Sequence, residues 1–284
     1  MTIALFLFLI IYASILQSMS DFLKTMAEAS AARADLINTS FSSADLDLPL
    51  LPLSFSDFDV IAEIKDRSPA EGNLSTKSID RVSRAKAYSD GGAIAISVLT
   101  EPSRFGGDLS HMIDVVNAVP NTPVMRKDFL VEPIQILEAR KAGASGILLI
   151  TTMLSNTKLR EMLACAWDCG LFVLLESFSE EDLKRSTDLL MDTANRDRLE
   201  SGQLMYGVNS RNLKTLEVDF ERFRYLANLL PSGRCVAESG LNKTDDFTRL
   251  SSWGYQMALV GSSLMRSKDP ASMISKMKIA GATA

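Results

Sequence analysis

Histidine and cysteine, the residues that most often hold transition metals, are scarce in this chain of 284 residues. It contains one histidine, His111, and three cysteines, Cys165, Cys169 and Cys235. An odd total of three implies no secreted disulfide framework. Cys165 and Cys169 stand four apart, but no second Cys or His pair completes a zinc site, so we interpret both as core thiols. We expect His111 to lie at a helix start, in a surface or capping role.

An excess of positive charge is also missing. Lys and Arg number 30 against 35 Asp and Glu, which gives a net charge of −5, and both signs are mixed along the chain. Without a basic stripe there is no electrostatic footprint for nucleic acid, so no nucleic-acid partner is expected. No glycine-rich dinucleotide fingerprint follows the first predicted strand, which disfavours an open doubly wound sheet.

A hydrophobic run, IALFLFLIIYASIL, occupies residues 3–16. It is short for a spanning helix, which needs about 20 apolar residues, and it lacks the basic start and cleavage site of a secretory signal. Three interpretations remain: a membrane anchor or signal-like segment, an extra helix packed on the domain, or an upstream extension from a misassigned start. In the third, which we favour, Met19 begins the chain and Ser20 caps the first helix.

What the chain does contain is a regular alternation of strand and helix. Eight short apolar runs alternate along the chain with loops and stretches of helical period. They cover residues 60–64, 93–99, 124–126, 146–150, 172–176, 205–208, 235–238 and 257–260. Such alternation predicts a parallel sheet with right-handed crossovers, and eight units fit a closed barrel.

We therefore predict an α/β fold, a single (β/α)8 TIM barrel with an N-terminal helical extension. The barrel helices are expected at 80–88, 109–116, 133–142, 156–167, 180–190, 219–229 and 245–253. Another amphipathic helix is expected at 21–38, with Phe22, Leu23, Met26, Ala29 and Leu36 as its apolar positions, and an irregular connector at 39–58. The predicted division is a hydrophobic segment 1–18, a helix and connector 19–58, and a barrel 59–284.

Charged and polar residues stand at the ends of several predicted strands. In a barrel these ends face a common mouth, where active sites are built. Burying unpaired ions side by side costs several kcal/mol each, so their repetition around one mouth indicates a site rather than a fold device. The residues are Glu63 and Lys65 after strand one, Lys127 after strand three, Glu176 after strand five, Asn209 and Arg211 after strand six, and Glu238 and Ser239 after strand seven.

A phosphate site is predicted next to this cluster. Gly240 follows strand seven, and Gly261 and Ser262 follow strand eight. Glycine lets backbone N–H groups approach an anion, and Ser262 can begin a short helix whose N-terminus favours negative charge. A simple turn with a helix cap is the alternative.

These residues fall within longer motifs that closely resemble indole-3-glycerol phosphate synthase, the (β/α)8 enzyme of tryptophan biosynthesis. The motifs are IAEIKDRSPAEG at 61–72, AISVLTEPSRFGG at 95–107, VMRKDF at 124–129, GVNSRNL at 207–213, Glu238-Ser239-Gly240, and stretches at 133–144, 174–176 and 260–266. The resemblance implies a carboxy-lyase that converts 1-(2-carboxyphenylamino)-1-deoxyribulose 5-phosphate to indole-3-glycerol phosphate, carbon dioxide and water. It implies no metal and no organic cofactor. We expect a cytoplasmic monomer whose partner is this phosphorylated small molecule.

The resemblance also implies a role for each residue. Lys127 is the general acid, with its pKa lowered by nearby cations and partial desolvation. Glu176 is the general base, and Glu63 orients Lys65 and Lys127. Lys65 holds the substrate carboxylate or phosphate and can donate a proton during dehydration. The remaining expected site residues are Asn209 and Arg211, which position the carboxylate and hydroxyls; Glu238 and Ser239, which line the substrate side; Ser68, in a mobile first loop; Phe105 and Phe129, beside the anthranilate ring; and Gly240, Gly261 and Ser262, at the phosphate.

Some stretches depart from the family's usual pattern. Asp66-Arg67 follows Lys65, Ser177-Phe178 follows Glu176, and residues 186–203 form a longer and more polar connection, expected as a solvated excursion far from the mouth. Two other functions remain as alternatives. One is another phosphate-binding barrel enzyme, similar to phosphoribosyl anthranilate isomerase or the tryptophan synthase α subunit. The other is a non-catalytic barrel scaffold.

Overall fold

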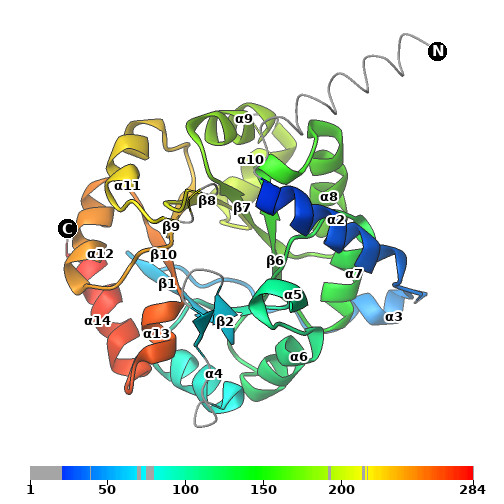
Figure 1. The fold of residues 1–284 in the computed structure, drawn as a ribbon, viewed down its shortest axis with the longest axis horizontal. Helices are drawn as coiled ribbons and strands as arrows, with labels where there is room; N and C mark the ends of the chain where they lie inside the picture. Colours follow the sequence, from blue (N-terminus) through cyan, green and yellow to red (C-terminus); the bar gives the residue numbers. More distant parts are fainter. Residues whose placement is uncertain are drawn as a thin grey trace.

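Eight parallel strands follow one another around a closed barrel in the computed structural model (Figure 1). The structure describes residues 21–38, 40–68, 72–74, 80–190, 193–212, 215 and 217–283. Each strand pairs with the next one along the chain, and the last pairs with the first, so the predicted TIM barrel is confirmed. The strands are β1 (Asp59–Ile64), β4 (Ala95–Leu99), β5 (Val124–Lys127), β6 (Gly146–Ile150), β7 (Phe172–Ser177), β8 (Leu204–Asn209), β9 (Arg234–Glu238) and β10 (Met257–Val260).

Helices form an outer ring around the strands (Figure 1). The seven predicted barrel helices are α4 (Arg81–Asp90), α6 (Leu109–Ala118), α7 (Pro133–Lys141), α8 (Asn156–Asp168), α9 (Glu180–Leu190), α11 (Glu221–Leu226), which continues as η2 (Ala227–Leu229), and α12 (Thr244–Ser252). A further helix, α14 (Pro270–Ala282), was not predicted. Its start signal was present, because Asp269 caps the helix by accepting a hydrogen bond from the Ser272 N–H and Pro270 follows it.

The register of the strands brings the predicted site residues to one level. Leu99 of β4 pairs with Lys127 of β5, and Asn209 of β8 pairs with Glu238 of β9. On the other side of the barrel, Ile150 of β6 pairs with Glu176 of β7. Because side chains alternate between the faces of a strand, neighbours in register present their side chains to the same face of the sheet.

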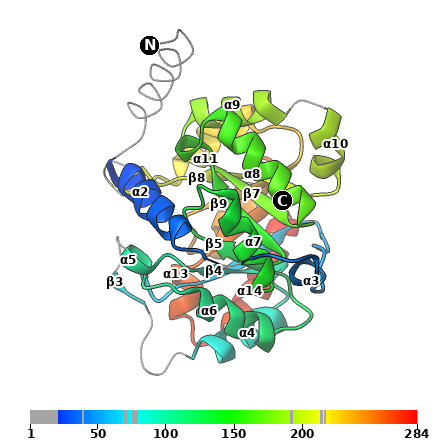
Figure 2. The same ribbon diagram turned by 90° about the vertical axis from the view of Figure 1, so that its right-hand side faces the viewer.

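The N-terminal helix α2 (Asp21–Asp35) lies across the mouth end of the barrel (Figure 2). Its buried residues are Leu23, Met26, Ser30 and Ala34. The helix ends three residues earlier than predicted. For that reason Leu36, which the periodicity placed on the apolar face, is 80% exposed. No helix in the described ranges combines the length and the apolar character needed to cross a membrane. The run at 3–16 and the predicted cap Ser20 lie outside the described residues.

The connector after α2 is held against the barrel helices. It contains a short helix, α3 (Ser43–Leu46), whose Asp45 forms an ion pair with Lys141 of α7 at 3.0 Å. The guanidinium of Arg140, which is fully buried, donates to the backbone carbonyls of Leu46 and Leu48. The N-terminal extension therefore contacts the barrel both at the mouth and on its outer side.

The long polar connection at 186–203 lies away from the mouth, as predicted, but it carries a helix of its own. Helix α10 (Thr193–Glu200) follows α9 and stands at the opposite end of the barrel from α2 (Figure 2). The Arg198 guanidinium lies 4.5 Å from the ring centre of Trp167, and Leu199 packs against the core. This part of the chain is anchored by packing and is not simply solvated.

Candidate active site

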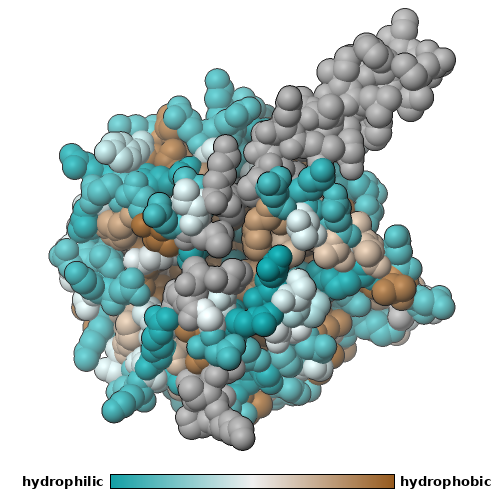
Figure 3. All heavy atoms as spheres, in the orientation of Figure 1, coloured by the Kyte–Doolittle hydropathy of each residue, from teal (hydrophilic) through white to brown (hydrophobic). Residues whose placement is uncertain are grey.

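A cavity of about 470 Å³ opens at the carboxyl ends of the strands. All fourteen residues predicted for the site line it: Glu63, Lys65, Ser68, Phe105, Lys127, Phe129, Glu176, Asn209, Arg211, Glu238, Ser239, Gly240, Gly261 and Ser262. The surface of this end of the molecule is mostly hydrophilic (Figure 3). The strand ends thus converge on one site, as the pattern of polar residues predicted.

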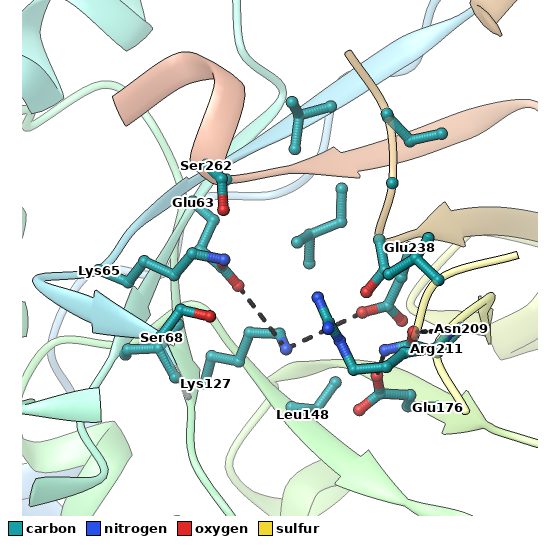
Figure 4. Close-up of a pocket in the computed structure, with 18 of the residues that line it drawn as sticks. Glu63, Lys65, Ser68, Lys127, Leu148, Glu176, Asn209, Arg211, Glu238 and Ser262 are labelled. Carbon is teal, nitrogen blue, oxygen red and sulfur yellow. Dashed lines mark hydrogen bonds and ion pairs between the residues drawn. The ribbon is translucent and has the colours of Figure 1, made fainter. Parts of the chain in front are cut away.

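Two lysines share one carboxylate on the first side of the cavity. Lys65 Nζ lies 2.7 Å from Glu63 Oε1, and Lys127 Nζ lies 3.6 Å from Glu63 Oε2 (Figure 4). Glu63 is only 3% exposed. Burial raises the pKa of its carboxyl, but the charges of Lys65 and Lys127 outweigh that effect and lower the pKa on balance. Glu63 is therefore ionised and can orient both ammonium groups.

Lys127 reaches into the centre of the cavity, between Glu63 and Glu238 (Figure 4). Its Nζ is 4.0 Å from Glu238 Oε2. Burial lowers the pKa of this lysine, but the negative charges of Glu176, Glu63 and Glu238 outweigh burial and raise the pKa. The expectation that nearby cations and desolvation lower this pKa is therefore wrong. Three carboxylates surround this ammonium group, and their combined charge is not evident from the sequence.

Glu176 and Asn209 form a hydrogen-bonded pair on the other side of the cavity. Asn209 donates from Nδ2 to Glu176 Oε1 at 2.5 Å, and both side chains are buried. The amide oxygen of Asn209 accepts the backbone N–H of Arg211 at 2.9 Å. One amide therefore holds both the Glu176 carboxylate and the start of the loop that carries Arg211.

Glu238 is the acid of the site whose burial is least offset by hydrogen bonds or nearby positive charge. It is 1% exposed, and neither of its carboxyl oxygens finds a hydrogen-bond partner among the residues that the structure describes. Burial and the adjacent charge of Glu176 raise its pKa well above the ordinary value, although Lys127 opposes the shift. A protonated Glu238 removes one negative charge from the cluster and gains an O–H with which to donate to Glu176.

The predicted phosphate end brings two loops together. Ser239 and Gly240 have φ angles of 75° and 76°, so two successive residues are left-handed. The Ser210 hydroxyl donates to the Ser239 carbonyl at 3.1 Å, and the Ser263 hydroxyl donates to the Leu241 carbonyl at 3.0 Å. The first bond connects the loop after β8 to the loop after β9. The second connects the loop after β9 to the short helix α13 (Ser262–Arg266), which begins at the predicted residue.

Gly261 lies close to an ion pair, which the sequence did not reveal. A Cβ atom at this position would lie 2.3 Å from Glu63 Oε1 and 2.9 Å from Lys65 Nζ. Real Cβ atoms do not approach other atoms so closely, because van der Waals repulsion rises steeply. The absence of a side chain at Gly261 therefore leaves room for the Glu63–Lys65 ion pair.

An apolar wall faces the charged residues. The rings of Phe105 and Phe129, both predicted, lie 6.1 Å apart. Phe22 contacts Phe129 edge to face, with ring centres 6.0 Å apart and an interplanar angle of 77°. Phe22 also lines the cavity, although its apolar spacing on a helix predicted core packing and not a site residue. Other apolar lining residues that were not predicted are Leu23, Leu99, Leu148, Ile150, Phe178, Val218, Phe220, Leu241, Leu259 and Val260.

The first loop is described in part. Residues 67–68 and 72–73 pair as a small antiparallel hairpin of β2 (Arg67–Ser68) and β3 (Gly72–Asn73), and Ser68 is buried. Arg67 Nε donates to the Arg104 carbonyl at 3.1 Å, and Asp66 accepts from Arg81 at 2.9 Å. The residues that depart from the family's pattern thus anchor the base of the loop. Its mobility stays a prediction.

Comparison with known proteins decides the family. Residues 18–277 match the family model of indole-3-glycerol phosphate synthase. The chain belongs to the indole-3-glycerol phosphate synthase family. The synthase of Paenarthrobacter aurescens is 42% identical over 81% of this chain and 79% of its own length. The synthase of Mycobacteroides abscessus is 38% identical over 94% of this chain and 95% of its own length.

Solved structures of other enzymes share the fold with this synthase-family chain. A 3-hexulose-6-phosphate synthase from Salmonella typhimurium superposes with a TM-score of 0.61. The alignment covers 80% of this chain and 99% of that one, at 14% identity. At this identity the likeness concerns the barrel alone.

The scarce residues noted at the outset do not line the cavity. Cys165 and Cys169 are free thiols on α8, the first half-buried and the second buried. His111 lies in the first turn of α6, where its Nε2 is 3.1 Å from the Arg81 guanidinium. Their positions agree with the interpretation as packing or surface residues.

Proposed function

We propose that this chain is a working indole-3-glycerol phosphate synthase, with the ring of strand-end residues as its catalytic groups. The observation that carries the proposal is the placement of Lys127 Nζ between Glu63 and Glu238, with the Glu176–Asn209 pair facing it across one cavity. Membership of the family supplies the reaction: ring closure, decarboxylation and dehydration of the phosphorylated anthranilate–ribulose adduct.

In the first step Lys127 acts as the general acid. It donates a proton to the ribulose carbonyl oxygen while the aromatic carbon that bears the carboxylate attacks the carbonyl carbon. A new carbon–carbon bond forms, and the carboxylate leaves as carbon dioxide with its bonding electrons returned to the ring. The three carboxylates that raise the pKa of Lys127 keep it protonated before the substrate arrives.

The second step removes water. Lys65, held by Glu63 at 2.7 Å, donates a proton to the departing hydroxyl, and Glu176 takes the proton whose loss completes the indole. Asn209 fixes the Glu176 carboxylate by a hydrogen bond to its Oε1 atom. This division gives each of the two lysines a separate step.

Binding is divided between the two ends of the cavity. Backbone N–H groups of Gly240, Gly261 and Ser262 suit the phosphate, and the Arg211 guanidinium suits the substrate carboxylate through its planar fork. The phenylalanine wall of Phe105 and Phe129 suits the anthranilate ring. The polar and apolar ends of the substrate thus match the two ends of the site.

The test is turnover by the purified chain. The protein is incubated with the carboxyphenylamino-deoxyribulose phosphate, and formation of the indole product is followed by its fluorescence. We expect saturable formation of indole-3-glycerol phosphate with release of one carbon dioxide per product. Binding of the substrate without turnover would instead indicate the non-catalytic scaffold and contradict the proposal.

A further inference from the structure

The residue after Lys127 is a buried aspartate with no free acceptor. The Asp128 side chain is fully buried. Its Oδ1 accepts the Phe129 backbone N–H at 2.8 Å, and its Oδ2 accepts the Thr100 hydroxyl at 2.7 Å. The carboxylate therefore ties the end of β4 to the backbone that leads from Lys127 to Phe129. Both of those neighbours belong to the candidate active site.

The principal charge partner of Asp128 comes from outside the barrel. Arg33 of α2 donates from Nη2 to Oδ1 at 2.7 Å and from Nη1 to Oδ2 at 2.9 Å, across 95 positions of sequence. Such a bidentate pair fixes the orientation of the two side chains as well as their distance, which a lysine cannot do. The Arg33 side chain is 28% exposed, so the pair lies at the edge of a buried cluster.

A second contact joins the same helix to the same cluster. Arg126 bonds Asp128 at 3.2 Å and also donates to the Gln135 carbonyl at 3.0 Å. The Gln135 amide in turn donates to the Ser30 hydroxyl at 2.9 Å, one helical turn before Arg33. The α2 helix is thereby attached through side chains to the segment that follows β5.

The beginning of α2 touches the same segment from the cavity side. Phe22 packs edge to face on Phe129, and Phe22 and Leu23 both line the cavity. The helix thus contacts Phe129 directly through Phe22 and indirectly through Arg33 and Asp128. A shift of α2 would be transmitted to Phe129 at both points.

We propose that Arg33 is a positioning residue, which acts through Asp128 to hold the backbone from Lys127 to Phe129 in its catalytic place. The inference rests on the proposed function, because it assigns Arg33 to the reaction that Lys127 performs. Docking of the N-terminal helix is then a condition for turnover and not only for stability.

The charge balance supports a specific role for Arg33. Asp128 faces two cations, Arg33 and Arg126, while Glu101 and Glu138 also lie near enough to Arg33 to act on it. Burial raises the pKa of Asp128, but the bond from Arg33 and the charge of Arg126 outweigh it and lower the pKa. Without Arg33, one buried carboxylate would depend on Arg126, which also serves Glu138.

The experiment compares Arg33→Met, Arg33→Lys and Asp128→Asn with a matched control, Lys141→Met. The control removes a different ion pair of the N-terminal extension, that of Lys141 with Asp45, which does not reach the site. We expect Arg33→Met to lower kcat roughly 10- to 100-fold with KM changed by less than about threefold, because small displacements of a catalytic group cost that much. Arg33→Lys should recover part of the loss, and Lys141→Met should keep the wild-type kcat.

Two further measurements separate positioning from general stability. In the double variant Arg33→Met/Asp128→Asn, kcat should fall no further than in the worse single variant, because Arg33 acts through Asp128. Amide hydrogen exchange at Phe129 should accelerate in Arg33→Met, while exchange in β7 stays unchanged, since the Phe129 N–H is bonded to Asp128.

The outcomes distinguish failure of the inference about Arg33 from failure of the proposed function. Wild-type kcat together with wild-type exchange at Phe129 in Arg33→Met overturns the inference. So does a loss of activity that merely follows the folded fraction measured by thermal unfolding. Absence of turnover in the unmodified chain overturns the proposed function instead, and the exchange experiment still decides whether Arg33 holds the Lys127–Phe129 segment.

Discussion

The Nδ2 atom of Asn209 lies 2.5 Å from the Oε1 atom of Glu176. The two residues come from adjacent strands, β8 and β7, and both are buried at the mouth of the barrel. An amide that donates to a carboxylate restricts its rotation. In the proposed reaction Asn209 therefore holds the Glu176 carboxylate in place for proton transfer.

Replacement of Glu176 by Gln tests the assignment of the base. The substitution keeps the shape but removes the group that accepts the proton, so kcat should fall by roughly 10²- to 10⁴-fold. KM should change only modestly, since the amide still fills the same space. Steady-state kinetics with the fluorescent indole product measure both values. An unchanged kcat would remove Glu176 from the role of base.

Replacement of Asn209 by Ala should reduce kcat less than loss of Glu176 does. The variant loses the hydrogen bond that orients Glu176 and the acceptor for the Arg211 N–H, but the carboxylate remains. We expect a fall of roughly tenfold or more in kcat, in line with the loss of a buried, charge-assisted bond. If Asn209→Ala instead lost as much kcat as Glu176→Gln, the amide would have a direct part in the reaction.

Replacement of Lys127 by Met should abolish turnover and leave the protein folded. Methionine retains most of the apolar stem but carries no proton, and Glu63 keeps its closer partner Lys65 at 2.7 Å. Circular dichroism and thermal unfolding should therefore resemble those of the wild type, while indole formation disappears. A near-normal kcat in a folded Lys127→Met variant would contradict its role as the general acid.

The raised pKa of Glu238 predicts how the free energy of unfolding depends on pH. Its pKa in the folded protein is raised by burial and by Glu176, so between the ordinary and the raised pKa the folded state binds more protons than the unfolded state. The contribution of Glu238 to the free energy of unfolding is then full below the ordinary pKa of 4.5 and is lost as pH rises through the raised value. Glu238→Gln imitates the protonated form and should remove this decline.

The measurement is denaturant unfolding of the wild type and Glu238→Gln across pH 5 to 9. The wild type should lose stability relative to the variant as pH increases. Parallel curves for the two proteins would show that Glu238 has no raised pKa. Because the comparison is made between variants at each pH, the titrations of other groups cancel in the difference.

The barrel could be predicted from the sequence because the patterns that indicate its strands and helices lie within short stretches of the chain. Short apolar runs and helical periods alternate regularly, and the polar residues at the strand ends follow directly from those runs. Leu36 shows the limit of the same reasoning, because its apolar spacing suggested burial but the helix ends before it. The roles of Phe22 and Arg33 depend on how α2 docks against residues about a hundred positions away, and no local pattern contains that information.

The balance of charges around Lys127 likewise could not be predicted from the sequence. The direction of the pKa shift at Lys127 depends on the sum of three carboxylates from β1, β7 and β9, and the chain order shows neither their distances nor their burial. Gly261 is a similar case. Its place after β10 suggested a phosphate-binding loop, but its closeness to Glu63 appears only when β10 and β1 pair to close the barrel.

Replacement of Gly261 by Ala tests whether that closeness matters. The added Cβ would meet Glu63 Oε1 at 2.3 Å and must displace the Glu63–Lys65 pair. We expect kcat to fall at least tenfold, because the groups that orient Lys65 and Lys127 move. The matched control is Gly281→Ala in α14, where a Cβ would lie 2.2 Å from the Phe58 ring, away from the cavity. That variant should lower the unfolding temperature but keep kcat per folded molecule. If both variants lost stability and neither lost kcat, the space left by Gly261 would serve packing alone.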